Sequence, residues 1–153
     1  MKIRLPSPRL WLFLPLLLAA CASTPDPTRV KGQVTAADQV NPGAGVQSAP
    51  VVVRIYALSA ASPFDGQDFF TLYEEDRQAL GETLLYREER QLNPGDTWPL
   101  TLSLPANAAY LGVIAAFRTM DQAQWRRLVP LRPGKTNRVT VRLEGNRIQI
   151  EGQ

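Results

Sequence analysis

Apolar and polar residues alternate with a period of two along most of the chain beyond residue 28. In five segments apolar side chains fall on one side of an extended backbone: residues 30–36, 51–56, 100–104, 139–143 and 147–151. This pattern is typical of a strand with one face on a core and the other in water. The less regular segments 83–92 and 125–131 are also expected to be strands, and Pro130 indicates an edge strand or a bulge.

The segment Tyr110–Phe117 differs from these strands because both of its faces are apolar. It is therefore expected to be a central strand that is covered on both sides. Turn sequences such as Asn93–Asp96 and Glu144–Asn146 separate the strands. A total of about eight short strands predicts a mainly β fold, in which two sheets form a β-sandwich.

Residues 63–81 interrupt the alternation and predict a short helical insertion between two strands. Phe69 and Tyr73 have helical spacing, Asp68 is suited to cap a helix start, and Gly81 is suited to end one.

The bulky aromatic residues are assigned to packing rather than to ligand binding. We expect the pair Phe69–Phe70 to lie in the core. Trp98 and Trp125 are expected to pack in the core or at the ends of the sheets.

The N-terminal residues 1–20 have the organisation of a secretory signal peptide. The basic residues Lys2, Arg4 and Arg9 precede or flank an eleven-residue apolar run, Leu10–Ala20. A transmembrane helix needs about 20 apolar residues, so this run is too short to span a bilayer.

Cys21, the single cysteine, follows directly after Leu-Ala-Ala. This arrangement resembles the lipobox of bacterial lipoproteins, in which the cysteine receives a diacylglycerol and the preceding peptide is removed. Lipidation of Cys21 is therefore expected; the alternative is an ordinary signal peptide with a free cysteine near its end. Residues 21–28 would then be the lipidated cysteine and a polar tether with a reach of at most about 25 Å, and residues 29–153 the sandwich domain.

Removal of the signal peptide changes the charge balance. The whole chain has 17 Lys and Arg against 14 Asp and Glu, but the mature part is balanced. Composition thus gives no support for binding to nucleic acid or to anionic lipid.

The residue types exclude most catalytic chemistry. The chain contains no histidine, no second cysteine and no glycine-rich phosphate loop, so histidine-dependent triads and the common zinc sites are ruled out. The adjacent Glu88 and Glu89 point to opposite faces of a strand and cannot line one cleft. We therefore expect no enzyme activity, no metal site and no cofactor.

The connection between the first two strands is long and carries no charge. It comprises Gln39, Val40, Asn41, Pro42, Gly43, Ala44, Gly45, Val46, Gln47 and Ser48. Sandwich hairpins usually have loops of two to five residues. On residue type alone, this segment is either a plain surface connection or a contact loop.

Several segments together resemble the outer-membrane lipoprotein of the bacterial type VI secretion system (TssJ family). They follow one another in order over nearly the whole mature domain: Asn41–Pro42, Ala49–Leu58, Phe69–Glu74, Leu80–Gly81, Leu92–Gly95, Tyr110–Arg118 and Trp125–Arg126.

The resemblance implies a transthyretin-like sandwich with an added helical piece and no enzyme activity. It also implies that the domain binds the periplasmic C-terminal region of a large inner-membrane protein (TssM) through the loop between the first two strands. Carried over to this chain, that loop is Gln39 to Ser48, with Asn41, Pro42 and Val46 favoured as contacts. Ala22, in place of an aspartate after the anchor, points to the outer membrane.

A different class of function remains open, namely a lipid-anchored periplasmic module that binds a small ligand. That alternative predicts a sizeable pocket with convergent polar groups.

Overall fold

The computed structural model describes residues 24–44 and 47–153. The predicted sites at Cys21, Gly45 and Val46 lie outside these residues. Within them the chain forms eight strands, as the alternation predicts: β1 (Thr28–Val40), β2 (Val51–Leu58), β3 (Leu84–Leu92), β4 (Thr97–Leu104), β5 (Tyr110–Ala116), β6 (Arg126–Pro130), β7 (Thr136–Gly145) and β8 (Arg147–Gly152).

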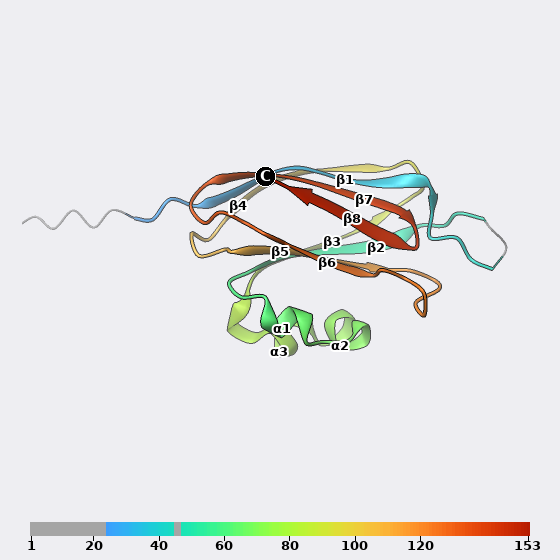
Figure 1. Ribbon diagram of the computed structural model, residues 1–153, viewed down its shortest axis with the longest axis horizontal. Coiled ribbons are helices and arrows are strands. Elements are labelled where there is room, and N and C mark those ends of the chain that lie inside the picture. Colours follow the sequence, from blue (N-terminus) through green and yellow to red (C-terminus); the bar gives the residue numbers. More distant parts are fainter. Residues whose placement is uncertain (1–23, 45–46) are drawn as a thin grey trace, which may run out of the picture.

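The strands form two sheets that pack face to face, as the sandwich prediction requires (Figure 1). One sheet has the order β4-β1-β7-β8, in which β1 and β7 are parallel, and the other has the order β3-β2-β5-β6. Strand β6 is an edge strand, which agrees with the position of Pro130. Inward side chains of both sheets form one continuous core.

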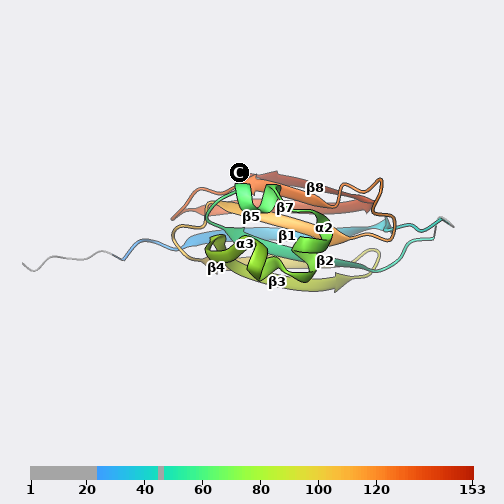
Figure 2. The same cartoon turned by 90° about the horizontal axis from the view of Figure 1, so that it is seen from below.

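A layer of short helices covers the outer face of the β3-β2-β5-β6 sheet (Figures 1 and 2). It consists of α1 (Ser62–Asp65), α2 (Phe69–Glu74), α3 (Asp76–Leu80) and the 3-10 turn η1 (Gly81–Thr83). Strand β5 is therefore buried on both faces, as its two apolar sides predict. The ring of Phe64 packs over Gly112 of β5, where an added Cβ would lie 3.1 Å from the ring.

The expected helix signals are present in this layer, with one correction to the packing. The side chain of Asp68 accepts a hydrogen bond from the Thr71 backbone N–H and so caps α2, and Gly81 ends α3 with a positive φ of 52°. Phe69 is buried, but Phe70 is 65% exposed. The assignment of Phe70 to the core was wrong, because Phe69 and Leu72 form the buried face of α2 and the next residue after Phe69 lies about 100° around the helix.

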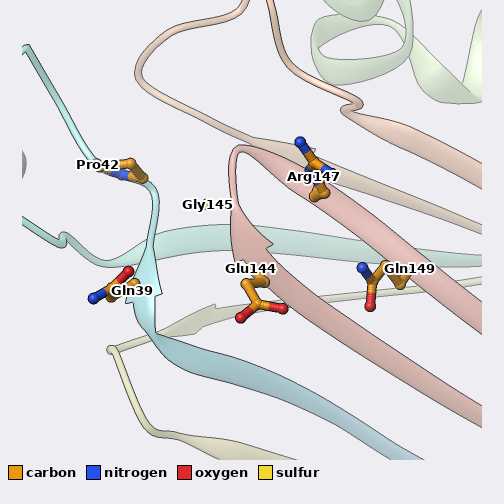
Figure 3. A pocket seen from close by; sticks show the side chains of 6 residues that line it. All are labelled: Gln39, Pro42, Glu144, Gly145, Arg147 and Gln149. Atoms are coloured by element: carbon orange, nitrogen blue, oxygen red, sulfur yellow. The ribbon is translucent and has the colours of Figure 1, made fainter.

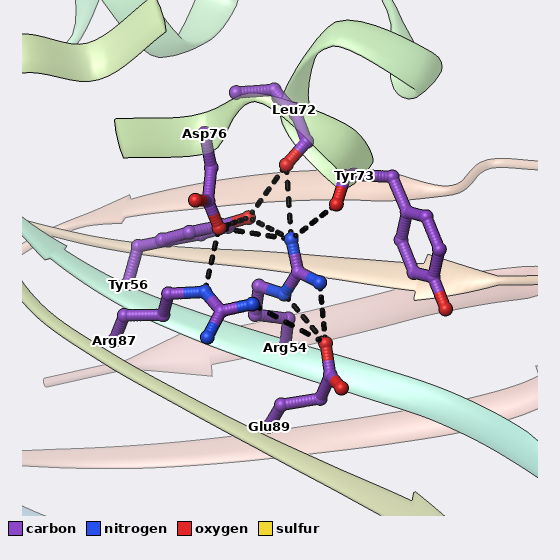
Figure 4. Close-up of polar contacts among 7 residues, drawn as sticks. All are labelled: Arg54, Tyr56, Leu72, Tyr73, Asp76, Arg87 and Glu89. Carbon is purple, nitrogen blue, oxygen red and sulfur yellow. Dashed lines mark hydrogen bonds and ion pairs between the residues drawn. The ribbon is translucent and has the colours of Figure 1, made fainter. Parts of the chain in front are cut away.

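A buried ionic network joins the helical layer to the sheet beneath it (Figure 4). The side chain of Arg54, only 5% exposed, projects from the outer face of β2 and donates to the Asp76 carboxylate at 2.9 Å. It also donates to the carbonyl oxygens of Leu72 and Tyr73, both at 3.0 Å. Because these groups end one helix and begin the next, a single guanidinium fixes the junction between α2 and α3.

Two groups on β3 complete the network from its other side. Glu89 accepts from Nε of Arg54 at 2.7 Å, and Arg87 donates to Asp76 at 2.6 Å. The Tyr56 hydroxyl donates to the Leu72 carbonyl oxygen at 3.1 Å. Burial raises the pKa of this hydroxyl well above its ordinary value, so Tyr56 stays a neutral hydrogen-bond donor.

Strand β1 also depends on a close backbone approach at Gly32. A Cβ built on Gly32 would lie 1.7 Å from the carbonyl oxygen of Val139 in the adjacent strand β7. No L side chain fits at that distance, so glycine is required for the parallel pairing of β1 with β7.

Candidate functional site

The loop between β1 and β2 lies at the end of the sandwich opposite to residues 24–27, where the described chain begins (Figure 1). We call this the distal end, and its described residues are 41–44, 47–50, 93–96, 117–125 and 145–146. Backbone hydrogen bonds connect these segments with β1 and with one another: Ala36 N of β1 donates to Asp96 O at 2.9 Å, Asn41 N donates to Gly145 O at 2.8 Å, and Gln124 N donates to Asn146 O at 2.9 Å. The loop therefore leaves a rigid platform built from four separate segments.

Asn41 fixes the base of the loop. Its side-chain amide donates to the Pro50 carbonyl oxygen at 2.7 Å, and its Oδ1 accepts from the Arg118 backbone N–H at 2.7 Å. Its φ is +51°, a conformation that asparagine tolerates better than most residues. A further backbone bond from Ala49 N to Val40 O closes the loop. Residues 42–48 are thus held at both ends.

The structure distributes the eight described residues of the predicted loop among different environments. Gln39 and Val40 belong to β1 rather than to the loop, because the strand continues to Val40. Val40 is 0% exposed and Asn41 only 2%, so neither offers a side chain to a partner. Three of the others are exposed (Gln39, Ala44, Gln47) and three are half-buried (Pro42, Gly43, Ser48).

A surface hollow of about 320 Å³ lies beside the loop (Figure 3). Pro42 and Gln39 form one side of it, and the β7–β8 hairpin forms the other through Glu144, Arg147 and Gln149. Its side chains are mostly polar and include both charges. This hollow suits a polar segment of a protein partner better than an apolar small ligand, which needs an apolar pocket.

Sequence reasoning did not connect the β7–β8 hairpin with the loop. It predicted a turn at Glu144–Asn146, and Gly145 does adopt a positive φ of 56°. The alternation gives no signal for which turns meet at one end. Only the sheet order, with β7 beside β1, brings this hairpin next to Gln39 and Pro42.

Two further properties concern only residues 24–44 and 47–153. No group of three or more potential metal-ligating side chains occurs in them. None of their helices is sufficiently long and apolar to cross a membrane.

Comparison with known proteins assigns the chain to a family. The family model described as type VI secretion lipoprotein (VasD, EvfM, TssJ) matches residues 28–146. The chain belongs to this family. The matched region contains every strand except β8, together with the helical layer and the distal end. The resemblance seen in the sequence is thereby confirmed.

Solved structures of the same fold agree with this assignment. TssJ1, the type VI secretion lipoprotein of Pseudomonas aeruginosa, is 31% identical with a TM-score of 0.79, over 83% of this chain and 97% of that one. Lip of Serratia marcescens, a membrane-bound component of the type VI secretion system, is 28% identical with a TM-score of 0.69, over 82% and 98%.

A more distant similarity concerns the fold alone. This chain has the same fold as a chain in the structure described as the T6SS protein TssM C-terminal domain (869-1107) from EAEC. The two are 23% identical with a TM-score of 0.66, over 80% of this chain and 97% of that one. A search of curated proteins gave no match.

Proposed function

We propose that this lipoprotein is held on the periplasmic face of the outer membrane by acyl chains on Cys21, and that its distal end binds the periplasmic C-terminal region of a TssM-like inner-membrane protein. The observation that carries this proposal is the position of the loop. A 13-residue strand, β1, separates residues 24–27 from Asn41 at the base of the loop, and at about 3.3 Å per residue it spans about 40 Å. An anchor at one end therefore leaves the distal end directed away from the membrane.

The composition of the loop supports a role in protein contact. Residues 42–48 contain no charged side chain, so a partner can cover them without removing a charge from water. Their fixed base reduces the conformational entropy that is lost on binding. Gln39 and Gln47 offer amide groups, and the adjacent hollow adds Glu144 and Arg147 at its rim.

The family and its relatives support the rest of the proposal. Lip is described as membrane bound, and a chain of this fold occurs in a structure that bears the name of TssM. A signal peptide at residues 1–20 and a tether that ends before β1 complete the arrangement. Anchoring near the partner raises its effective concentration, so a modest contact at the loop can suffice.

Replacing residues 42–47 by a Gly-Ser segment of equal length is expected to abolish binding to the periplasmic C-terminal region of the cognate TssM-like protein. The replacement keeps Asn41 and Ala49, so the base of the loop and the fold are preserved. Titration of the purified domain by calorimetry measures the affinity. A loss of at least about 100-fold is expected if the loop contains the central contacts.

The matched control changes exposed loop residues at the other end of the sandwich, Pro105→Ser with Asn107→Ser, and should bind like the unchanged domain. Circular dichroism checks that both variants are folded. Unchanged binding by the loop variant would exclude the loop as the contact. No binding by the unchanged domain would limit the family relationship to fold and membrane attachment.

Cys21→Ser is expected to release the protein from the membrane without unfolding it. The acyl chains contribute roughly 0.8 kcal/mol per buried CH₂, and all described strands begin after this residue. Membrane fractionation of cells that express the variant tests the result, with Ser23→Ala as a control that keeps the cysteine. Retention of Cys21→Ser in the outer membrane would contradict the lipid anchor.

A further inference from the structure

The charges of the mature chain balance overall, but acidic residues are concentrated in the helical layer. The helical layer and its connections, residues 62–83, contain six acidic residues and a single basic one, Arg77: Asp65, Asp68, Glu74, Glu75, Asp76 and Glu82. The sheet β4-β1-β7-β8 lies on the other side of the sandwich (Figure 1). The basic residues are shared between the two sheets. Arg54 and Arg87, beneath the helical layer, pair with its Asp76. Other basic residues lie on or beside the β4-β1-β7-β8 sheet, on the far side of the sandwich.

Five basic residues gather where the chain enters that sheet, and we call them the basic patch: Arg29, Lys31, Arg132, Lys135 and Arg138. All five are exposed. Lys31 lies directly beside Arg138 in the parallel pairing of β1 and β7. The backbone N–H of Arg29 donates to the carbonyl oxygen of Lys135 at 2.9 Å, which joins the preceding loop to the same corner.

The basic patch is not neutralised by the domain itself. Among the described residues, the ion pairs involve Arg54, Arg87, Arg90 and Arg142, and none involves a member of the patch. The acidic residues nearest in sequence or register are Asp26, before β1, and Glu151, which is opposite Thr140.

Placing Lys31 and Arg138 side by side brings like charges onto strands about 4.8 Å apart, which is unfavourable in the isolated domain. An anionic surface would remove that repulsion. A patch of this kind therefore indicates a negatively charged ligand.

We propose that the basic patch rests on anionic phospholipid head groups of the membrane that carries the Cys21 anchor. This inference depends on the anchor in the proposed function. The tether joins the domain at Thr28, next to Arg29, and its reach of at most about 25 Å keeps this corner close to the lipid surface. The contact orients the domain so that the acidic helical layer and the distal end face away from the membrane.

The local positive charge of the patch suits it to a lipid surface, although the mature chain as a whole has no net charge. Each Lys or Arg near an anionic membrane strengthens binding about fivefold, and the effect decays within about 8–10 Å at physiological salt. Head groups at the tether end therefore interact with the patch, whereas the helical layer lies on the opposite side of the two-sheet sandwich. The balanced net charge of the mature chain conceals this asymmetry.

Co-sedimentation with vesicles tests the inference on residues 22–153 without the lipid. This segment is used because all described strands and both core clusters lie within residues 28–152. Vesicles of phosphatidylcholine with phosphatidylglycerol should bind the domain, and vesicles of phosphatidylcholine alone should not. Lys31→Gln with Arg138→Gln should weaken binding roughly 25-fold, about fivefold per charge, and added salt should weaken binding of the unchanged domain.

The matched control removes the same net charge elsewhere, through Arg77→Gln on the helical layer and Arg118→Gln at the distal end, and should bind as before. Arg132→Gln with Lys135→Gln is a second patch variant, in a loop, in case the strand variant does not fold. No binding to the anionic vesicles, or equal weakening by the control, would overturn the inference.

A different result would identify an acidic protein surface as the ligand. In that case the patch variants bind vesicles normally but lose affinity for the TssM-like region. Because the vesicle test uses neither the loop nor the Cys21 lipid, its failure can be distinguished from failure of the proposed function.

Discussion

Gly32→Ala is expected to destabilise the domain by more than about 4 kcal/mol or to prevent folding. The new Cβ would lie 1.7 Å from the Val139 carbonyl oxygen, so β1 and β7 must separate or shift. Either movement breaks ladder hydrogen bonds and opens the core beside Val30 and Val34, which have no exposed surface. Urea unfolding monitored by tryptophan fluorescence measures the change, and loss of soluble protein would be the extreme result.

The neighbouring residue provides the control for this prediction. Gln33→Ala changes an exposed side chain of the same strand and is expected to alter the free energy of unfolding by less than about 0.5 kcal/mol. Equal unfolding free energies of the Gly32 and Gln33 variants would contradict the prediction, because they would show that β1 and β7 can move apart enough for a Cβ without loss of stability.

Arg54→Leu is expected to cost about 3–5 kcal/mol, because it leaves the Asp76 carboxylate buried with Arg87 as its remaining charged partner. It also removes the donors to the Leu72 and Tyr73 carbonyl oxygens. The helical layer should therefore open before the sandwich does. Faster trypsin cleavage at Arg77, together with a lower unfolding midpoint, would report this local loss.

A double variant separates the ion pair from simple loss of packing. Arg54→Leu with Asp76→Leu removes both buried charges, so it should be less destabilised than the sum of the two single variants. Arg54→Lys keeps the charge but loses the planar guanidinium with its several donors. Its stability is therefore expected to lie between those of the unchanged domain and Arg54→Leu. If the losses in unfolding free energy of the two single variants simply add in the double variant, Arg54 and Asp76 do not stabilise each other, and the network does not hold the helical layer on the sheet.

Most of the fold could be predicted because its signals are local. Clean alternation predicted five of the eight described strands, and two less regular segments predicted β3 and β6. The two apolar faces of Tyr110–Phe117 marked a central strand, and Pro130 marked an edge. Asp68 and Gly81 marked helix ends. In each case the residue type determines the structure within a few positions, so no knowledge of distant contacts was needed.

The remaining features depend on contacts between distant parts of the chain. In the sequence, Arg54 is a charged residue in an otherwise apolar strand, a pattern typical of a solvent-facing position. In the structure it is buried, because the helical layer covers that face of the sheet. Asn41 was favoured as a contact because the family resemblance places the partner-binding loop at Gln39 to Ser48. In the structure it connects Pro50 with Arg118, which is 77 positions away.

The charge distribution shows the same limit. Composition alone argued against an affinity for anionic lipid, since the mature chain is balanced. Lys31 and Arg138 are 107 positions apart, and only the parallel register of β1 and β7 makes them neighbours. A net charge is a sum over the chain, and it contains no information about where the charges lie.

The position of β1 also determines how the domain responds to a pulling force. The strand enters at the tether end, leaves at the distal end, and is paired with β4 on one side and β7 on the other. Tension between the anchor and the loop therefore acts along the strand, perpendicular to its ladder hydrogen bonds. Those bonds are sheared together instead of being unzipped one at a time. Under the proposed function, a load between the membrane anchor and a partner at the loop would therefore act along the direction in which this domain resists extension most strongly.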